Sequence, residues 1–356
     1  MNSSITNAEG APQGQARRGL TLKMLSFRNV SALYLLAMIC IIFAFWIPAK
    51  FFTWQDCKTI MENQAVTGIT AIGLVIPMAA GAFDLAVGTE VGLAVVLMAW
   101  LLFAAGLPLM LAILLTLLAG GLVGLTSGLL ITKVKIDSFI ATLAMSSVLT
   151  AIVIWMSSDE QIIGINSGFS RIAATQIFGI TLPVFILLVV SLLVWYGLEI
   201  TPVGRRIYAT GGNLEAARLA GVAVNSVIVL ALVSCGVIVA LGGIIEASSL
   251  NGGDPSIGPS YLLPAFTAAF LGSTQFKNGR FNVWGTIVAV FVLEAGVQGI
   301  ELASAPIWIP NLFDGLALAA AVGLARFETR GTSGSAIRRA IRMRSSTESS
   351  ESGETV

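Results

Sequence analysis

The sequence predicts an all-α protein that crosses a membrane about ten times. Hydrophobic residues make up 56% of the 356 positions and charged residues only 11%, whereas soluble domains carry about 25% charged residues. Apolar stretches of about 20 residues, the length that a helix needs to cross a bilayer, recur along the chain. Lysine and arginine residues collect in every second connection between these stretches, and this pattern gives an orientation.

The predicted spans follow one another at short intervals. Uncharged windows of spanning length cover Asn29–Ala49, Asn63–Phe83, Ser138–Ser158, Thr181–Leu198, Ser226–Ile245 and Pro255–Phe276. The uncharged window Val91–Thr132 is long enough for two spans, with the turn-forming sequence AAGLP at 104–108 between them. Two further apolar segments that contain acidic residues, Val283–Leu302 and Ile307–Ala325, bring the expected count to ten.

The charge distribution orients these spans. With the N-terminus in the cytoplasm, 17 of the 20 Lys and Arg residues lie in inside segments, and only Lys50, Lys58 and Arg171 lie outside. The positive-inside rule therefore places both termini in the cytoplasm. We expect a cytoplasmic tail at 1–28, a membrane domain at 29–325 with a cytoplasmic loop at 204–225, and a disordered, Ser/Glu-rich cytoplasmic tail at 326–356.

The composition excludes several kinds of chemistry. The chain has no histidine, and its three cysteines, Cys40, Cys57 and Cys235, have neither metal-binding nor disulfide spacing. A net charge of +1 gives no support to nucleic-acid binding. The phosphate-binding sequence G-x-x-x-x-G-K-[ST] is absent, so the chain cannot hold ATP by that motif. We expect no metal, no cofactor and no enzymatic activity in this chain.

A polar stretch, Gly204–Ser226, lies between two apolar runs of membrane length. Asn213 can cap a short helix whose first turn holds Glu215, an acid that the helix dipole favours there. Ala216 and Ala217 favour helix, and Gly221 is typical of the residue that ends one. Two interpretations stay open: a helix that docks in a groove of another protein, and an ordinary helix of an interfacial loop.

Two glycine patterns predict close backbone packing or a broken helix. Asp84 lies between Gly81 and Gly88 in the sequence AGAFDLAVG. An acid beside glycines is typical of a broken or re-entrant helix buried in protein, but a plain cytoplasmic turn also fits the topology. The second pattern is a stripe at helical spacing, which favours close helix packing over a flexible gate; it consists of Gly120, Gly121, Gly124 and Gly128.

Three segments together resemble the permease subunits of ribose-type sugar ABC importers. They are GAFDLAVG (Gly81–Gly88), GRRIYATGGNLEAARLAG (Gly204–Gly221) and PAFTAAFLGSTQFKNGRFNVWGT (Pro264–Thr286). The resemblance covers roughly residues 60–325. Within these segments the chain departs from the family pattern at four positions, namely Ala82, Phe83, Ala86 and Ser273. The acids Glu294 and Glu301, which follow the third segment, are not part of the pattern either.

The resemblance implies a division of labour between subunits. Two permease subunits of the bacterial inner membrane form the path for a monosaccharide or related polyol, a periplasmic binding protein delivers it, and separate ATPase subunits bind and hydrolyse Mg-ATP. The polar stretch would then hold the coupling helix that contacts the ATPase, through Arg205, Arg206, Asn213, Glu215, Ala216, Ala217, Arg218 and Gly221. The arginines alternatively serve only as positive-inside anchors. Candidate residues of the translocation path are Gly81, Asp84, Gly88 and Gln298.

An ion-coupled secondary transporter is the alternative function. Acidic residues within membrane spans are functional candidates by default, and the last two predicted spans contain Glu294, Glu301 and Asp314. Gln298 follows Glu294 at the i, i+4 spacing of one helix face. In this alternative the three acids would carry the coupling ion.

Overall fold

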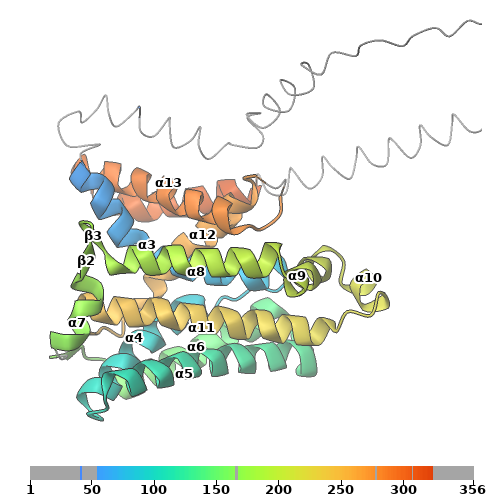
Figure 1. The fold of residues 1–356 in the computed structure, drawn as a ribbon, viewed down its shortest axis with the longest axis horizontal. Helices are drawn as coiled ribbons and strands as arrows, with labels where there is room; N and C mark the ends of the chain where they lie inside the picture. The colour runs from blue at the N-terminus through green and yellow to red at the C-terminus, as the bar shows by residue number, and fades with distance from the viewer. Residues whose placement is uncertain (1–40, 42–53, 165–166, 277–278, 307, 324–356) are drawn as a thin grey trace, which may run out of the picture.

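The computed structural model describes residues 41, 54–164, 167–276, 279–306 and 308–323 (Figure 1). The first predicted span and the two predicted cytoplasmic tails lie outside the described residues, apart from single position 41.

The described chain is almost entirely helical. Six helical segments are long and apolar enough to cross a membrane: α3 (Trp54–Ala79), α5 (Leu109–Leu129) with the π-helical turn η2 (Leu130–Val134), α6 (Ser138–Ser157), α8 (Leu182–Glu199), α11 (Val224–Leu250) and α13 (Val283–Leu302). Shorter apolar helices are α4 (Val87–Phe103), α12 (Leu262–Ser273) and the helix Trp308–Gly323.

Small elements join these helices. They are the short helices α7 (Ser167–Ala174), α9 (Pro202–Gly212) and α10 (Leu214–Leu219), the 3-10 turn η3 (Gly258–Tyr261), and the two-residue strands β1 (Ile162–Ile163), β2 (Gln176–Ile177), β3 (Ile180–Thr181) and β4 (Gly252–Gly253). Strand β1 pairs with β4 and β2 pairs with β3, both antiparallel. The chain is thus a polytopic all-α membrane protein, as predicted.

The small elements mark opposite ends of the helical bundle. The long helices α5, α8, α11 and α13 all run lengthwise across the view in Figure 1, with α10 projecting at one end and α7, β2 and β3 at the other. Under the predicted orientation the α10 end faces the cytoplasm. Helix α4 lies inside the bundle, in contact with α5, α6 and α11, and most of its side chains are buried.

The window Pro255–Phe276 differs from the continuous span expected there. Its helix α12 has only 12 residues, about 18 Å at 1.5 Å per residue, against a hydrocarbon core about 30 Å thick. The preceding residues form an irregular segment followed by the 3-10 turn η3, which packs on α4; a Cβ on Gly258 would lie 2.7 Å from the Gly88 carbonyl oxygen. A non-helical backbone is tolerated inside a membrane protein where other protein covers it.

The glycine stripe packs α5 closely against α11, as predicted. A Cβ on Gly120 would overlap the carbonyl oxygen of Gly236, and one on Gly124 would overlap that of Leu232. Because only glycine leaves room for the facing backbone, these positions set the distance between the two helices.

Candidate functional site

The polar stretch folds into two short helices where one was expected. Helix α8 ends at Glu199, and the Thr201 hydroxyl accepts a hydrogen bond (3.3 Å) from the Gly204 N–H at the start of α9. Pro202 occupies the first turn of α9, where its missing N–H costs nothing. The sequence Thr201–Gly204 therefore both ends the incoming span and begins a new helix.

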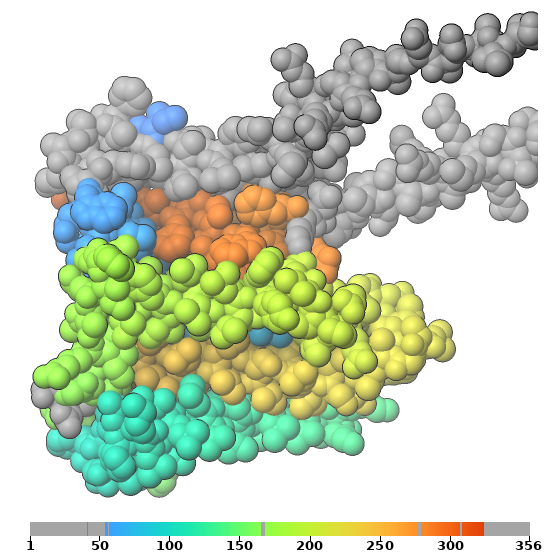
Figure 2. Space-filling model, in the orientation of Figure 1, coloured from blue at the N-terminus to red at the C-terminus, as the bar shows by residue number. Residues whose placement is uncertain are grey.

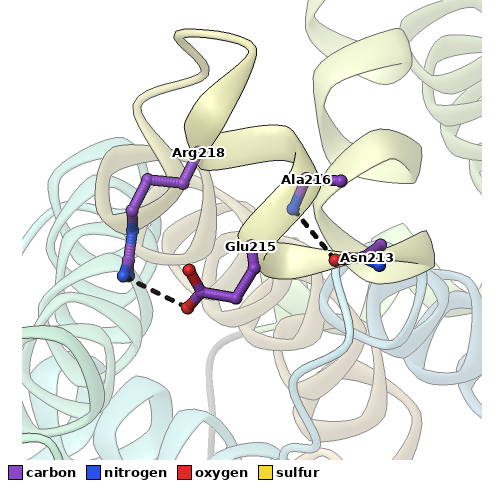
Figure 3. Close-up of polar contacts among 4 residues, drawn as sticks. All are labelled: Asn213, Glu215, Ala216 and Arg218. Atoms are coloured by element: carbon purple, nitrogen blue, oxygen red, sulfur yellow. Dashed lines mark hydrogen bonds and ion pairs between the residues drawn. The ribbon is translucent and has the colours of Figure 1, made fainter.

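Helix α10 has the local structure that its sequence predicts (Figure 3). The Asn213 Oδ1 accepts a hydrogen bond (2.9 Å) from the Ala216 N–H, which is an N-cap. Glu215 lies in the first turn and pairs with Arg218 at 3.3 Å. Gly221 has a left-handed φ of 81° directly after the helix, a conformation that favours glycine.

The two faces of α10 differ in exposure. Glu215, Arg218 and Leu219 are exposed, with Leu219 88% accessible. Ala217 is buried instead and packs in a small apolar cluster with Ala82, Val224, Ile228 and Leu232. Of the predicted contact residues, Ala217 thus lies against the bundle while its helix forms the projecting tip in Figure 2.

Helix α9 is tied to the connection between α12 and α13 through Tyr208. The Tyr208 hydroxyl donates to the Phe281 carbonyl oxygen (2.9 Å) and lies 3.3 Å from a carboxylate oxygen of Glu199. The Arg280 guanidinium sits 3.4 Å from the centre of the Tyr208 ring, a cation–π contact. Burial, reinforced by the Glu199 charge, raises the pKa of Tyr208, so the hydroxyl keeps its proton and remains a donor.

Helix α9 also touches the connection between α3 and α4, backbone against backbone. A Cβ on Gly211 would overlap the Ala79 carbonyl oxygen, and one on Gly81 would lie 3.3 Å from the Gly211 Cα. Gly81 has a φ of 82°, which favours glycine. The structure therefore places Gly81, a predicted path residue, at the contact with α9.

Five aromatic rings gather beside these two contacts and line a cavity of about 720 Å³. Phe83 stacks on Phe139 with ring centres 4.5 Å apart and faces Phe270 at 6.2 Å. Phe270 in turn meets Phe266 at 6.3 Å and Phe281 at 5.6 Å. No sequence pattern indicates this cluster, because its members come from four separate segments of the chain.

Two of the four departures from the family pattern meet in this aromatic cavity. Phe83 contributes its ring, and Ser273, whose hydroxyl donates to the Phe270 carbonyl oxygen (2.7 Å), also lines the cavity. Phe281 links the cavity to α9, because its backbone carbonyl accepts the bond from Tyr208.

Asp84 lies in a buried break between α3 and α4. Hydroxyl groups of α6 accept hydrogen bonds from the backbone of this break. The Leu85 N–H, for example, donates to Thr142 Oγ1 (3.0 Å). Asp84 is 0% exposed, and one carboxyl oxygen accepts from the Ala86 N–H (3.0 Å). Within the described residues its other oxygen and both oxygens of the buried Glu90 have no hydrogen-bond partner. The structure thus favours the broken helix over an exposed turn.

The predicted path residues do not come together around one cavity. Asp84 and Gln298 line neither the aromatic cavity nor the polar cavity between α3, α13 and the helix Trp308–Gly323. Gly88 packs against the Gly258 backbone, so its role in the structure is close packing.

The three acids of the last two spans occupy different surroundings. Glu294 is 9% exposed and accepts a hydrogen bond from the Gln64 amide (2.6 Å). Asp314 faces the same polar cavity as Glu294. Glu301 is exposed near the end of α13. Only two of the three acids therefore share a site.

These features define the class of protein: a multi-pass membrane protein with a capped helix projecting from one end and cavities between its helices. Residues 57–322 match the family described as branched-chain amino acid transport system, permease component, and the chain belongs to this family.

Named relatives cover most of the chain. The ribose import permease protein of Haemophilus influenzae is 33% identical over 69% of this chain and 77% of its own length. The ribose import permease protein of Bacillus subtilis is 32% identical over 75% of this chain and 83% of its own length. The D-allose transport system permease protein of Escherichia coli is 26% identical over 82% of this chain and 90% of its own length. No solved structure matches the chain.

Proposed function

We propose that this chain is the transmembrane subunit of an ABC importer in the bacterial inner membrane, carrying a monosaccharide or related polyol. Family membership and relatives named for ribose and allose support this proposal. The observation that carries the mechanism is the capped, exposed helix α10 at one end of an apolar bundle. A periplasmic binding protein delivers the ligand, and separate ATPase subunits supply the energy.

In this proposal α10 is the coupling helix. Its exposed side chains Glu215, Arg218 and Leu219 contact a groove of the ATPase, and the buried Ala217 seats the helix on the bundle. Arg205 and Arg206, both exposed on α9, flank the contact. Asn213 and Gly221 keep the helix short by capping its two ends.

Two contacts transmit movement of α10 into the membrane domain. The Tyr208 hydroxyl donates a hydrogen bond to the Phe281 carbonyl oxygen, and Gly211 lies against the backbone of the α3–α4 connection. Both connections carry a ring of the aromatic cavity, Phe281 in one and Phe83 in the other. A shift of α9 would therefore move two walls of the cavity, which lies at the cytoplasmic end of the path.

The remaining parts of the machine come from other chains. A second permease subunit, identical or related, completes the path; ATP and Mg²⁺ bind to the partner ATPase, and this chain is a permease without enzymatic activity. Its tails at 1–28 and 326–356 lie in the cytoplasm with the loop 204–225.

The test is to uncouple ATP hydrolysis from transport at α10. Glu215→Arg and Gly221→Arg should each lower uptake by the assembled complex at least tenfold, because they reverse a charge and add a side chain at a left-handed position. The chain should still purify as a folded membrane protein. The control Glu160→Arg changes an exposed acid between β1 and α6 and should leave uptake unchanged. Wild-type uptake by both α10 variants would refute the coupling role.

An ion-coupled secondary transporter remains the second candidate because Glu294 and Asp314 face one cavity. It requires uptake by this chain alone, driven by a proton or sodium gradient without ATP. Such uptake in liposomes that contain only this chain would favour the second candidate over the importer.

A further inference from the structure

The polar cavity lies between α3, η3, α13 and the helix Trp308–Gly323 and has a volume of about 240 Å³. This is slightly below the range of about 300–1,000 Å³ typical of sites for drug-sized ligands, so a single small molecule fits. Its polar lining consists of Asn63, Gln64, Thr67, Ser260, Tyr261, Glu294 and Asp314. Two of these lining residues, Glu294 and Asp314, carry carboxyl groups.

The carboxyl groups of this cavity are held in different ways. Glu294 is oriented by the Gln64 amide, which donates to its Oε2 at 2.6 Å. The half-buried Asp314 carboxyl has no hydrogen-bond or ion-pair partner within the described part of the chain. Its acceptor capacity is therefore available to a molecule in the cavity.

The charges of the lining restrict the ligand. No lysine or arginine of the described residues lines the cavity, so the two carboxyl groups would repel an anion such as a sugar phosphate. Carboxylates accept hydrogen bonds, whereas amides and hydroxyls both donate and accept. A molecule with several hydroxyl groups matches this set, because each hydroxyl can donate to a carboxylate and accept from an amide.

The polar cavity and the aromatic cavity lie along one helix face. Asp314 lines the first, whereas Leu318 and Val322, one and two turns further along the same helix, line the second. Eight residues of helix separate Asp314 from Val322, about 12 Å. The two cavities therefore follow one another along this helix, and the aromatic cavity is the one nearer α9.

From this geometry we infer that the polar cavity is a binding site for a neutral, hydroxyl-rich molecule of monosaccharide size, with Glu294 and Asp314 as its hydrogen-bond acceptors. The inference rests on the proposed function and deepens it, because it assigns a binding site for the sugar within this chain. The ligand would leave the polar cavity toward the aromatic cavity.

Protection of a cysteine in the cavity tests ligand occupancy directly. Asn63, an exposed residue of the lining, is changed to cysteine in full-length chain whose three native cysteines are replaced by alanine, within the assembled transport complex. D-ribose should slow labelling of this cysteine by a thiol reagent, whereas sodium chloride at equal osmolarity should not. A second single cysteine at Asn251→Cys, exposed beyond α11, should label equally fast with and without D-ribose.

The carboxyl variants then assign the acceptors. Glu294→Gln and Asp314→Asn should each raise the D-ribose concentration for half-protection about tenfold or more, since each removes a charged hydrogen-bond acceptor. Asp314→Asn breaks no hydrogen bond seen within the described residues, so it keeps the test valid if Glu294→Gln fails to fold. The control Glu301→Gln changes an exposed acid on α13, the helix that carries Glu294. It should leave the D-ribose concentration for half-protection unchanged.

Three outcomes separate the site from the proposed function. ATP-driven D-ribose uptake without any protection of the cysteine would overturn the site and leave the importer intact. Protection by D-ribose in a complex that shows no ATP-driven uptake would support the site and refute the importer. Protection by sodium and not by D-ribose would overturn the inference and assign the cavity to a cation.

Discussion

Single glycines determine how closely the central helices approach. Gly120 and Gly124 of α5 face the carbonyl oxygens of α11 with no room for a side chain. The sequence predicted this contact because the glycines recur at helical spacing. It did not identify Gly236 as the matching position on α11, since a single glycine in an apolar run carries no periodic signal.

Gly124→Val should destabilise the membrane domain by about 1–3 kcal/mol, the usual cost of an overpacked core. The reason is that its Cβ would overlap the Leu232 carbonyl, so α5 and α11 must move apart. The thermal midpoint of the purified chain in detergent measures the effect. Gly197→Val is the matched control, because no atom lies within 4 Å of a Cβ built there; equal midpoints for both variants would contradict the packing account.

At the scale of elements, α9 is the part that the sequence did not reveal. The signals for α10 are local, because the cap Asn213, the acid Glu215 and the stop Gly221 are read directly from neighbouring positions. Helix α9 depends instead on contacts made at a distance, namely Tyr208 with Phe281 and Gly211 with Ala79. Such contacts leave no pattern in one sequence.

Tyr208→Phe should reduce the amount of sugar transported per ATP hydrolysed about fivefold while the ATPase rate persists. The substitution keeps the ring under Arg280 but removes the hydrogen bond to the Phe281 carbonyl, worth about 1 kcal/mol. Parallel assays of uptake and phosphate release measure the ratio. Tyr196→Phe, at an exposed position of α8, is the control, and an unchanged ratio in Tyr208→Phe would rule out transmission through this bond.

For the whole molecule, the sequence predicted the class and most of the spans, because apolar length and charge asymmetry are properties of composition along the chain. It missed the short α12 and the 3-10 turn η3 beside α4, which depend on glycines that meet only in the folded protein. That Asp84 and Gln298 line the translocation path stays a prediction; the aromatic and polar cavities are lined by residues from distant segments. Cavities require the fold, so sequence spacing could not locate them.

The orientation of the whole molecule can be measured with single cysteines in the cysteine-free chain. Leu219→Cys, on α10, should resist a membrane-impermeant thiol reagent in intact spheroplasts and react in inside-out vesicles. Ser256→Cys, exposed in the connection between β4 and η3, should show the reverse. Labelling of Leu219→Cys from outside would invert the predicted topology and remove α10 from the reach of a cytoplasmic ATPase.

Uptake of labelled D-ribose into liposomes would decide whether this chain works as an ABC importer. The liposomes hold the chain with its ATPase and partner permease, and the binding protein is supplied on the side opposite α10. An importer should accumulate D-ribose only with hydrolysable ATP on the α10 side and with the binding protein, and should continue to do so when the proton and sodium gradients are collapsed. Accumulation without ATP, abolished when the ion gradients are collapsed, would contradict this prediction.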